Sequence, residues 1–230
     1  MRYKHVFFDL DGTLWDFEAN SYKILLDIYN NFALDSKGVS DSDNFINTYK
    51  EHNGKLWELY NVDKISQKDL RVQRFQRTLA DFGINDDILS EKIGEYYVTT
   101  CPREKKLFPY TFDVLDYLKK KYTLYIITNG FHSTQQIKLD HSNLKNYFTQ
   151  VITSEKSGFK KPSPEIFQYA LDLSNCKKRE SIYVGDNLVI DILSCQKFGI
   201  DGIYFNPEQK FHVEKPEYEI QCLSEIMEIL

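Results

Sequence analysis

The chain has 230 residues, of which 42% are hydrophobic and 27% charged, and its formal net charge is −5. This length supports one large α/β domain or a domain with an insertion, and the composition lacks the polar bias of a disordered chain. A net negative charge gives no overall field that attracts a polyanion, so we expect no nucleic-acid polymer as a partner.

The cysteines and the apolar runs exclude further classes of protein. The four cysteines have neither CxxC nor zinc-like spacing, and no apolar stretch approaches the ~20 residues that cross a bilayer. We therefore expect buried thiols without disulfides or zinc, no membrane contact, and a cytoplasmic protein. The sequence gives no prediction of the oligomeric state.

The first predicted strand has the sequence HVFFD at residues 5–9 and runs directly into the motif DLDGT. Two carboxylates one residue apart, Asp9 and Asp11, thus follow the apolar run. In an open parallel sheet, ligands bind beyond the carboxyl ends of the strands. We therefore expect both carboxylates to lie at the functional site.

Residues 16–106 show helical periodicity and no convincing strand. An apolar repeat at residues 24–32 predicts one helix, and a second is predicted to begin at Ser66, because Ser66 and Asp69 have the spacing of a capping box. This segment is predicted to form an all-helical cap, inserted after the first strand and joined by a hinge at each end.

Short β-rich runs alternate with helical stretches in the second half of the chain. The runs lie at residues 122–129, 150–154, 181–186 and 202–206. Among the helical stretches, one is marked by Phe112, Leu115 and Leu118, which we expect to face the core. Alternation of strand and helix predicts a parallel sheet that is covered on both faces.

The predicted fold class is therefore α/β, with a Rossmann-like parallel sheet and an inserted all-helical cap. Residues 1–15 and 107–230 are assigned to the core, and residues 16–106 to the cap.

The spacing of the two aspartates has a mechanistic reason. One carboxylate can attack an electrophilic centre, while a carboxyl group two residues on protonates the leaving oxygen and then deprotonates water. Close packing separates the pKa values of two such groups, so that one stays ionised while the other holds a proton. A bare Asp-x-Asp pair often only caps a turn, but the preceding strand and the following Gly-Thr favour the catalytic interpretation.

The stretch FFDLDGTL resembles the first motif of the haloacid dehalogenase superfamily of phosphotransferases. Stretches similar to the other three motifs of this superfamily follow in the expected order. They are ITNG at 127–130, GFKKPSP at 158–164 and VGDNLVID at 184–191. Taken alone, the first of these stretches is typical of a turn, the second of a loop with a solvated lysine, and the third of a capped helix start. Together and in this order they indicate a phosphatase.

This resemblance assigns roles to individual residues. It implies that Asp9 is the nucleophile, Asp11 the general acid and base, and Lys161 the cation that neutralises the transferring phosphoryl group. Thr128 would donate its hydroxyl to a phosphate oxygen. The other residues that the resemblance places at the substrate are Thr13, Asn129 and Gly130.

The acidic residues imply a Mg²⁺ ion, because hard oxygen ligands suit this cation. By resemblance its ligands are Asp9, the backbone carbonyl of Asp11, and Asp186, while Asp191 supports the site without binding the ion directly. Together with Lys161, the ion would offset charge as a metaphosphate-like group passes to the nucleophile, and water would then release phosphate.

Substrate specificity is expected in the cap. Residues 47–79 look like the cap of the bacterial pyrimidine 5'-nucleotidases, which act on normal and non-canonical nucleoside monophosphates. The similarity lies in Tyr49, Asn53, Leu56, Trp57, Arg74 and Phe75, and in Phe131 and Gln136 after the second motif. Gly12 is a departure, because some members have Glu there. The implied partner is a small phosphomonoester.

Other interpretations stay open. A phosphatase for a sugar phosphate or phosphoglycolate would use the same four motifs, and a catalytically idle binding protein would be expected to lose motif acids that this chain keeps. Haloacid dehalogenation is disfavoured, because it makes no use of the second acid and family dehalogenases have another residue at Asp11. The cap aromatics Trp57, Tyr60 and Phe75 are also typical of a core, and Arg71, Arg74 and Arg77 of a solvated helix face.

Overall fold

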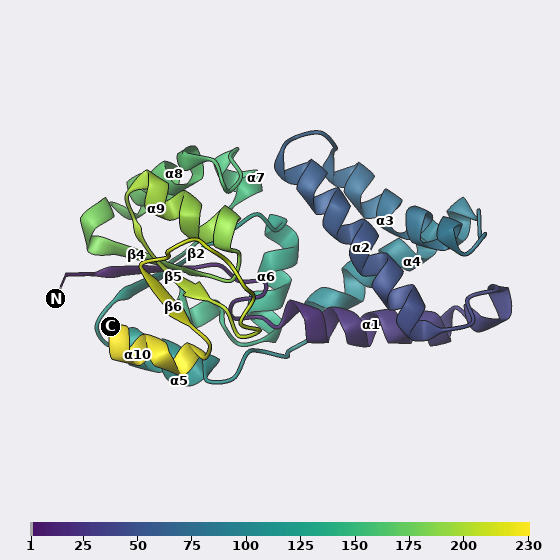
Figure 1. Ribbon diagram of the computed structural model, residues 1–230, viewed down its shortest axis with the longest axis horizontal. Coiled ribbons are helices and arrows are strands. Elements are labelled where there is room, and N and C mark those ends of the chain that lie inside the picture. Colours follow the sequence, from purple (N-terminus) through teal and green to yellow (C-terminus); the bar gives the residue numbers. More distant parts are fainter. Residues whose placement is uncertain (1) are drawn as a thin grey trace. The chain divides into compact units, whose positions relative to one another are not determined.

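The computed structural model describes residues 2–230, and the chain divides into two compact units (Figure 1). One unit combines Met1–Phe17 with Lys105–Leu230, and the other is Glu18–Glu104. The sequence places the boundaries at 15/16 and 106/107, close to these positions. That the two units are separate functional domains stays a prediction.

Within residues 2–230, the first unit holds a six-stranded sheet in the order β3-β2-β1-β4-β5-β6, with every neighbouring pair parallel. The strands are β1 (His5–Phe8), β2 (Thr123–Thr128), β3 (Gln150–Thr153), β4 (Ser181–Gly185), β5 (Asp201–Phe205) and β6 (Tyr218–Ile220). The chain builds outward from β1 in one direction through β2 and β3, and in the other through β4. Such a switch in strand order opens a ligand crevice beyond the carboxyl ends of the strands, here those of β1 and β4.

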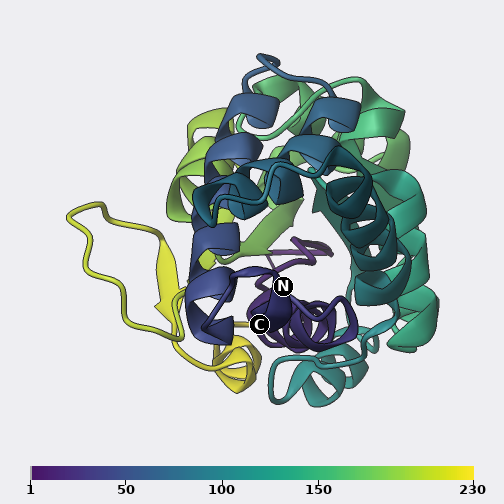
Figure 2. The same cartoon turned by 90° about the vertical axis from the view of Figure 1, so that its right-hand side faces the viewer.

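The sequence predicts five of these strands, and the α/β fold class is confirmed. β6 was missed, because it has only three residues and one of them, Ile220, is buried. It follows a segment that Figure 2 shows as a long loop (yellow), at residues 206–217, in which Phe211 and Val213 are exposed. So short a strand gives no periodic signal.

Helices cover both faces of the sheet. The helices of this unit are α5 (Thr111–Leu118), α6 (His132–His141), α7 (Ser154–Ser157), α8 (Pro164–Ser174), α9 (Ser194–Phe198) and α10 (Ile226–Ile229), with a π-helical turn, η5, at Leu188–Leu193. Figure 1 shows α8 and α9 on one face and α5 and α10 on the other. Successive residues of a strand point to opposite faces, so β1 and β4, which have both faces covered, are mostly apolar and, apart from half-buried His5, completely buried.

One residue predicted to face the core does not. Phe112 is exposed and lies against the ring of Tyr147, whereas Val114 is buried with Leu115 and Leu118. The helix begins at Thr111, and each residue adds about 100° of rotation. Phe112 therefore falls beside the buried stripe rather than on it.

The second unit is all-helical, as predicted: no strand occurs in Glu18–Glu104, every residue of which is described. Its helices are α1 (Phe17–Asn31), which starts at the unit boundary, α2 (Ser42–Asn61), α3 (Gln67–Asp81) and α4 (Asp87–Thr100). The predicted capping box is present, because the Ser66 hydroxyl accepts from the Asp69 N–H and the Asp69 carboxylate accepts from the Ser66 N–H. Asp41 and Asp86 are simple N-caps of α2 and α4, because their carboxylates accept from the N–H groups of Asp43 and Leu89.

The core of this unit is aromatic. The rings of Tyr49 and Phe75 stack with centroids 4.9 Å apart, and Tyr97 packs against both. Arg74 is only 6% exposed, with its guanidinium 4.6 Å from the centroid of the Tyr97 ring. A solvated face therefore describes Arg77, which is exposed, but not Arg74.

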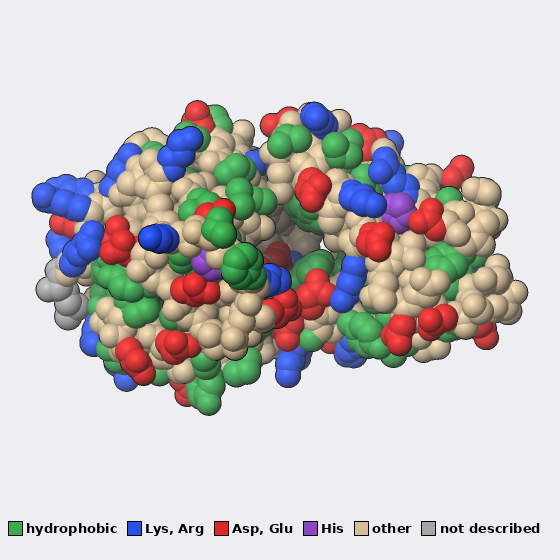
Figure 3. All heavy atoms as spheres, viewed as in Figure 1, with side chains coloured by type: hydrophobic (Ala, Val, Ile, Leu, Met, Phe, Trp, Pro, Cys, Tyr) green, Lys and Arg blue, Asp and Glu red, His purple; other side chains and the backbone are tan. Residues whose placement is uncertain are grey.

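The remaining expectations concern thiols and surface. All four cysteines are free thiols; Cys101 and Cys195 are buried, while Cys176 and Cys222 are only half-buried. None of the helices within residues 2–230 has the length and hydrophobicity of a membrane span. Acidic and basic side chains are interspersed on the face shown in Figure 3, in keeping with the modest net charge.

Candidate active site

The nucleophile candidate Asp9 continues β1 by one residue. Its N–H donates to the carbonyl of Val184 on β4, at 2.9 Å, so the pairing of the two strands extends to this position. Its side chain is almost completely buried, at 8% exposure. Asp9 therefore lies at the carboxyl end of β1, beside the β1/β4 switch point.

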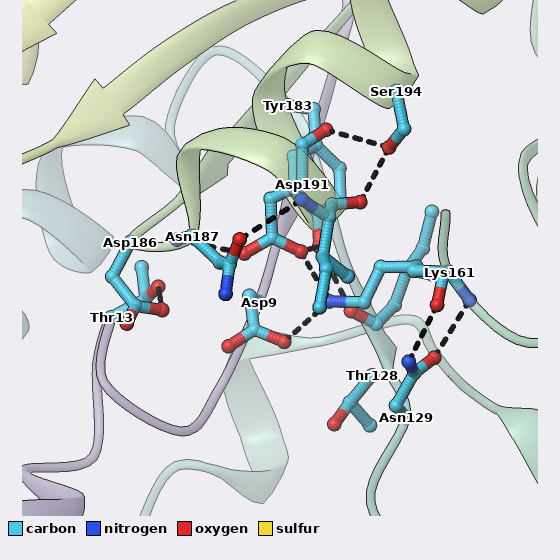
Figure 4. A network of polar contacts seen from close by, with 12 residues as sticks. Asp9, Thr13, Thr128, Asn129, Lys161, Tyr183, Asp186, Asn187, Asp191 and Ser194 are labelled. Carbon is cyan, nitrogen blue, oxygen red and sulfur yellow. Dashed lines mark hydrogen bonds and ion pairs between the residues drawn. The ribbon is translucent and has the colours of Figure 1, made fainter. Parts of the chain in front are cut away.

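Lys161 joins the acidic residues of this edge (Figure 4). Its ammonium donates to Asp9 at 2.7 Å, to Asp191 at 2.7 Å and to the hydroxyl of Tyr183 at 2.8 Å. An ammonium has three donors, and here each has a partner. Burial of this charge, only 2% exposed, is thereby compensated.

Asp186 and Asp191 come from the end of β4 and from the π-helical turn after it. The hydroxyl of Thr13 donates to Asp186 at 3.1 Å, and the N–H of Asn187 donates to Asp191 at 3.2 Å. Carboxylate oxygens of Asp9, Asp186 and Asp191 all lie within 4.8 Å of one another. Single π-helical turns are frequent at functional sites, and this one carries Asp191 toward β1.

The charges of this group are unbalanced. Burial, and after it the nearby charge of Asp191, raise the pKa of Asp186 to about 7, while the hydrogen bond from Thr13 acts in the other direction. Burial also raises the pKa of Asp9 well above its ordinary range, although Lys161 acts in the other direction. Burial alone would lower the pKa of Lys161, but Asp191 and Asp9 outweigh it and the pKa rises.

The donor set fits a divalent cation. When ionised, three carboxylates face one ammonium, so negative charge is in excess in a buried place. Carboxylate oxygens are hard ligands of the kind that Mg²⁺ prefers. A bound cation would stabilise the ionised carboxylates against the burial and the mutual repulsion that raise their pKa values.

The residues at the end of β2 and after it orient the hydroxyl of Thr128 and the backbone of Lys161. Thr128 Oγ1 accepts from the N–H of Gly130 at 3.0 Å and from the amide of Gln135 at 2.9 Å, so its own hydrogen remains to be donated. Asn129 Oδ1 accepts from the N–H of Lys161, and Asn129 Nδ2 donates to its carbonyl, both at 2.8 Å. Asn129 thus holds the backbone from which the lysine side chain extends.

Asp11 belongs to a second polar cluster. Its Oδ1 accepts from the ammonium of Lys138 at 2.5 Å, and its Oδ2 accepts from the amide of Gln135 at 2.8 Å. The Lys138 ammonium also lies 4.4 Å from the centroid of the Trp15 ring. The Asp11 side chain is 27% exposed, so part of this carboxylate is open to solvent.

The structure thus sorts the predicted site residues into groups. Asp9, Lys161, Asp186 and Asp191 lie together, and Thr13, which is fully buried, contacts Asp186. Thr128 and Gly130 share a hydrogen bond, and Asn129 contacts Lys161. The Asp11 carboxylate is not part of that acidic group and instead accepts from Gln135 and Lys138 of α6. The catalytic roles of all these residues stay predictions.

Sequence reasoning missed Tyr183, Gln135 and Lys138. A tyrosine inside an apolar strand reads as core, and gives no sign that its hydroxyl meets a lysine. Gln135 and Lys138 carried a usable signal, because residues three apart share a helix face and both are polar yet buried. The resemblance pointed to Gln136, whereas Gln135 makes the contacts to the site.

Comparison with known proteins places the chain in a family. The model of haloacid dehalogenase-like hydrolases matches residues 3–199. The pyrimidine 5'-nucleotidase PynA of Streptococcus pneumoniae is 30% identical over 100% of this chain and 96% of its own. The glyceraldehyde 3-phosphate phosphatase of Methanothermobacter thermautotrophicus is 30% identical over 98% of this chain and 97% of its own.

A solved structure agrees with this match. The HAD-hydrolase YfnB from Bacillus subtilis, bound to magnesium, superposes with a TM-score of 0.89 at 28% identity, covering 100% of this chain and 99% of that one. Family model, relatives and fold coincide over the segments that carry Asp9, Lys161 and Asp186. The chain therefore belongs to the haloacid dehalogenase-like hydrolases and is a phosphatase-type enzyme of that family.

Proposed function

We propose that the protein is a magnesium-dependent phosphomonoester hydrolase that works through an aspartyl-phosphate on Asp9 and acts on pyrimidine nucleoside 5'-monophosphates. The observation that carries the mechanism is the buried contact of Asp9 with Lys161, beside the carboxylates of Asp186 and Asp191. A nucleophile with a fixed cation next to it is suited to a reaction in which negative charge moves onto the protein.

In the first step, a carboxylate oxygen of Asp9 attacks the phosphorus atom and the bond from phosphorus to the ester oxygen breaks. Asp11 supplies the proton that this leaving oxygen takes up. In the second step, water attacks the phosphorus of the aspartyl-phosphate, and Asp11 accepts a proton from that water. Inorganic phosphate leaves, and Asp9 is restored as a carboxylate.

Lys161 and Thr128 stabilise the transferring group. When one oxygen of Asp9 becomes bonded to phosphorus, the Lys161 donor that had bonded it is free to turn to a phosphoryl oxygen. The hydroxyl of Thr128 has its hydrogen available for another. Donors that are already in place need little reorganisation as charge develops. Tyr183 and Asp191 keep the ammonium in position.

For the metal, Asp9, the backbone carbonyl of Asp11, and Asp186 would be the ligands, with Asp191 in support. When bound, Mg²⁺ neutralises charge on the phosphoryl oxygens and on the buried carboxylates. The acidic group and the magnesium in the related YfnB structure support this assignment.

The substrate class is supported by the similarity of residues 47–79 to pyrimidine 5'-nucleotidases and by the relative PynA. A sugar-phosphate phosphatase is the second candidate, because a glyceraldehyde 3-phosphate phosphatase is equally similar, at 30% identity over nearly the whole chain. The same four motifs serve both, so the two differ only in what surrounds the phosphate.

The test is release of phosphate from a panel of nucleoside monophosphates and sugar phosphates, with magnesium and with chelator, using the Asp9→Asn variant as the inactive control. A magnesium-dependent preference for UMP, CMP or dTMP is the expected result. A preference for sugar phosphates would keep the mechanism and reject the nucleotidase assignment. No turnover of any ester would favour a binding protein, and turnover in chelator would reject the metal.

A further inference from the structure

We propose that Gln135 and Lys138 are positioning residues for Asp11, holding its carboxylate at two points and tying it to the phosphate-binding hydroxyl of Thr128. The inference rests on the proposed function, in which Asp11 is the acid and base. Both residues lie on α6, outside the four motifs. Neither would touch the substrate; each acts through Asp11 or Thr128.

The first point of attachment is an ion pair with little access to water. The side chain of Lys138 is 7% exposed, and its ammonium lies 2.5 Å from Asp11 Oδ1. The ring of Trp15 contacts the same ammonium from another side, at 4.4 Å from its centroid. Carboxylate and indole together fix the lysine head group, which has many rotamers when unrestrained.

The second point of attachment is the fully buried amide of Gln135. Its nitrogen donates one hydrogen to Asp11 Oδ2 at 2.8 Å and the other to Thr128 Oγ1 at 2.9 Å. The carboxylate of Asp11 sets the direction of this amide, because the reverse placement would put two acceptor oxygens together. One side chain therefore joins the acid and base of the first motif to the hydroxyl of the second.

The position of the Gln135 side chain is locally unfavourable for the stability of the fold. Its Oε1 is buried and has no hydrogen-bond partner among the described residues. The side chain also needs a glycine beside it, because a Cβ at Gly130 would lie 2.0 Å from Gln135 Nε2. An unpaired acceptor in the core is unfavourable, and such a departure from good packing is expected where a side chain serves a site.

The two attachments fix the direction of the carboxylate without covering it. Each oxygen of Asp11 has one fixed donor, which restricts rotation about both side-chain bonds. The side chain remains 27% exposed, so a reacting oxygen can still approach it. Misplacement of a catalytic group by ~1 Å costs on the order of a hundredfold in rate. Loss of either attachment should therefore lower kcat while leaving KM nearly unchanged.

The test uses Lys138→Met and Gln135→Leu in the full chain, with magnesium and with UMP, glucose 6-phosphate and p-nitrophenyl phosphate as substrates. We expect kcat for the better of the two alkyl esters to fall by about ten- to a hundredfold, with a smaller loss in the rate of the first, nitrophenolate-releasing step of p-nitrophenyl phosphate, whose leaving group needs no proton. Lys138→Arg should restore part of the rate. Lys145→Met, which removes the exposed pair with Asp140, is the matched control.

A double-mutant cycle with Asp11→Asn separates positioning from structure. If Lys138 acts through Asp11, the double variant should be no slower than Asp11→Asn alone. Additive losses, or a rise in KM with kcat unchanged, would overturn the proposal. Thermal midpoints are measured for each variant. If Lys138→Met is unfolded, the rate of Gln135→Leu alone is measured, and a normal rate in that folded variant would overturn the proposal.

These outcomes are distinct from a failure of the proposed function. Wild-type turnover together with a normal Lys138→Met rate would reject the positioning role alone. Absence of wild-type turnover with all three esters would reject the proposed function, and with it the role of Asp11 on which positioning depends.

Discussion

The two polar clusters of the first unit contain similar residues but differ in their charge balance and exposure. Each pairs an aspartate of the DLDGT motif with a buried lysine, Asp9 with Lys161 and Asp11 with Lys138. The carboxylates of Asp186 and Asp191 lie close to Asp9, so negative charge is in excess there. Around Asp11, one carboxylate meets one ammonium, and the remaining partners are neutral.

The difference separates two tasks that a phosphatase must combine. The first cluster is nearly closed to water and short of positive charge, which suits the capture of a cation and the stabilisation of a phosphoryl group. The second is balanced and partly open, which suits exchange of a proton with a leaving group or with water. Substitutions in the two clusters should therefore impair different steps of the reaction.

The largest effect is expected for Asp9→Asn. The amide keeps the shape of the side chain but cannot form the aspartyl-phosphate, so turnover should fall below detection while the fold is retained. Phosphate release and circular dichroism measure the two properties. Asp140→Asn, an exposed site on α6, controls for loss of one charge. Near wild-type turnover in Asp9→Asn would remove Asp9 from the mechanism.

Asp11→Asn should lower the steady-state rate by on the order of a hundred- to ten-thousandfold. With p-nitrophenyl phosphate, the first step needs no proton donor, whereas hydrolysis of the aspartyl-phosphate still needs the base. Stopped-flow absorbance should therefore record a burst of nitrophenolate equal to the enzyme concentration, followed by slow release. Asp9→Asn should give no burst. A slow reaction without a burst would place the defect of Asp11→Asn before the second step.

A smaller effect is expected for Tyr183→Phe. The substitution removes the hydroxyl that contacts Lys161 and donates to the carbonyl of Ile127 at 3.0 Å, leaving the ammonium with two carboxylate partners. The rate should fall about tenfold, and the free energy of unfolding by about 1 kcal/mol. Tyr125→Phe, in a buried position of β2, is the matched control for both measurements. Equal rates in the two variants would show that Asp9 and Asp191 suffice to hold the lysine.

The smallest effect is on the stability of the metal-free protein and its dependence on pH. Because the pKa of Asp186 is raised to about 7, the folded state keeps a proton that the unfolded chain loses near its ordinary pKa of 3.8. This group therefore lowers the free energy of unfolding as the pH rises through that interval. Magnesium competes with the proton, so its stabilising effect should be larger at about pH 8 than at about pH 5.5.

Thermal unfolding at both pH values, with and without magnesium, measures this effect. Asp186→Asn should raise the midpoint of the metal-free protein at about pH 8, because it removes a repelled buried charge, and should abolish most of the magnesium shift. A magnesium shift that is independent of pH, or that persists in the variant, would contradict this account of the cluster.

The sequence predicts the parts of the site that topology alone brings together. Asp9 and Asp186 follow apolar strands, and parallel strands deliver their carboxyl ends to one edge, so both residues could be placed without side-chain detail. The contacts of Gln135 could not be predicted in this way. They depend on how α6 is rotated about its axis and on the side-chain conformation that brings the amide to Asp11 and Thr128. The same limit explains Phe112, which lies one position away from the buried stripe of α5.

Gly12 ties the first motif to the fourth. Its φ of +87° already disfavours a side chain, and a Cβ there would lie 2.4 Å from Asp186 Oδ2. The glutamate that some pyrimidine 5'-nucleotidases have at this position therefore cannot be grafted into this chain by itself. In a library that randomises position 12 with Asp186 retained, only glycine should survive selection for activity, whereas joint variation of the two loops would admit larger residues.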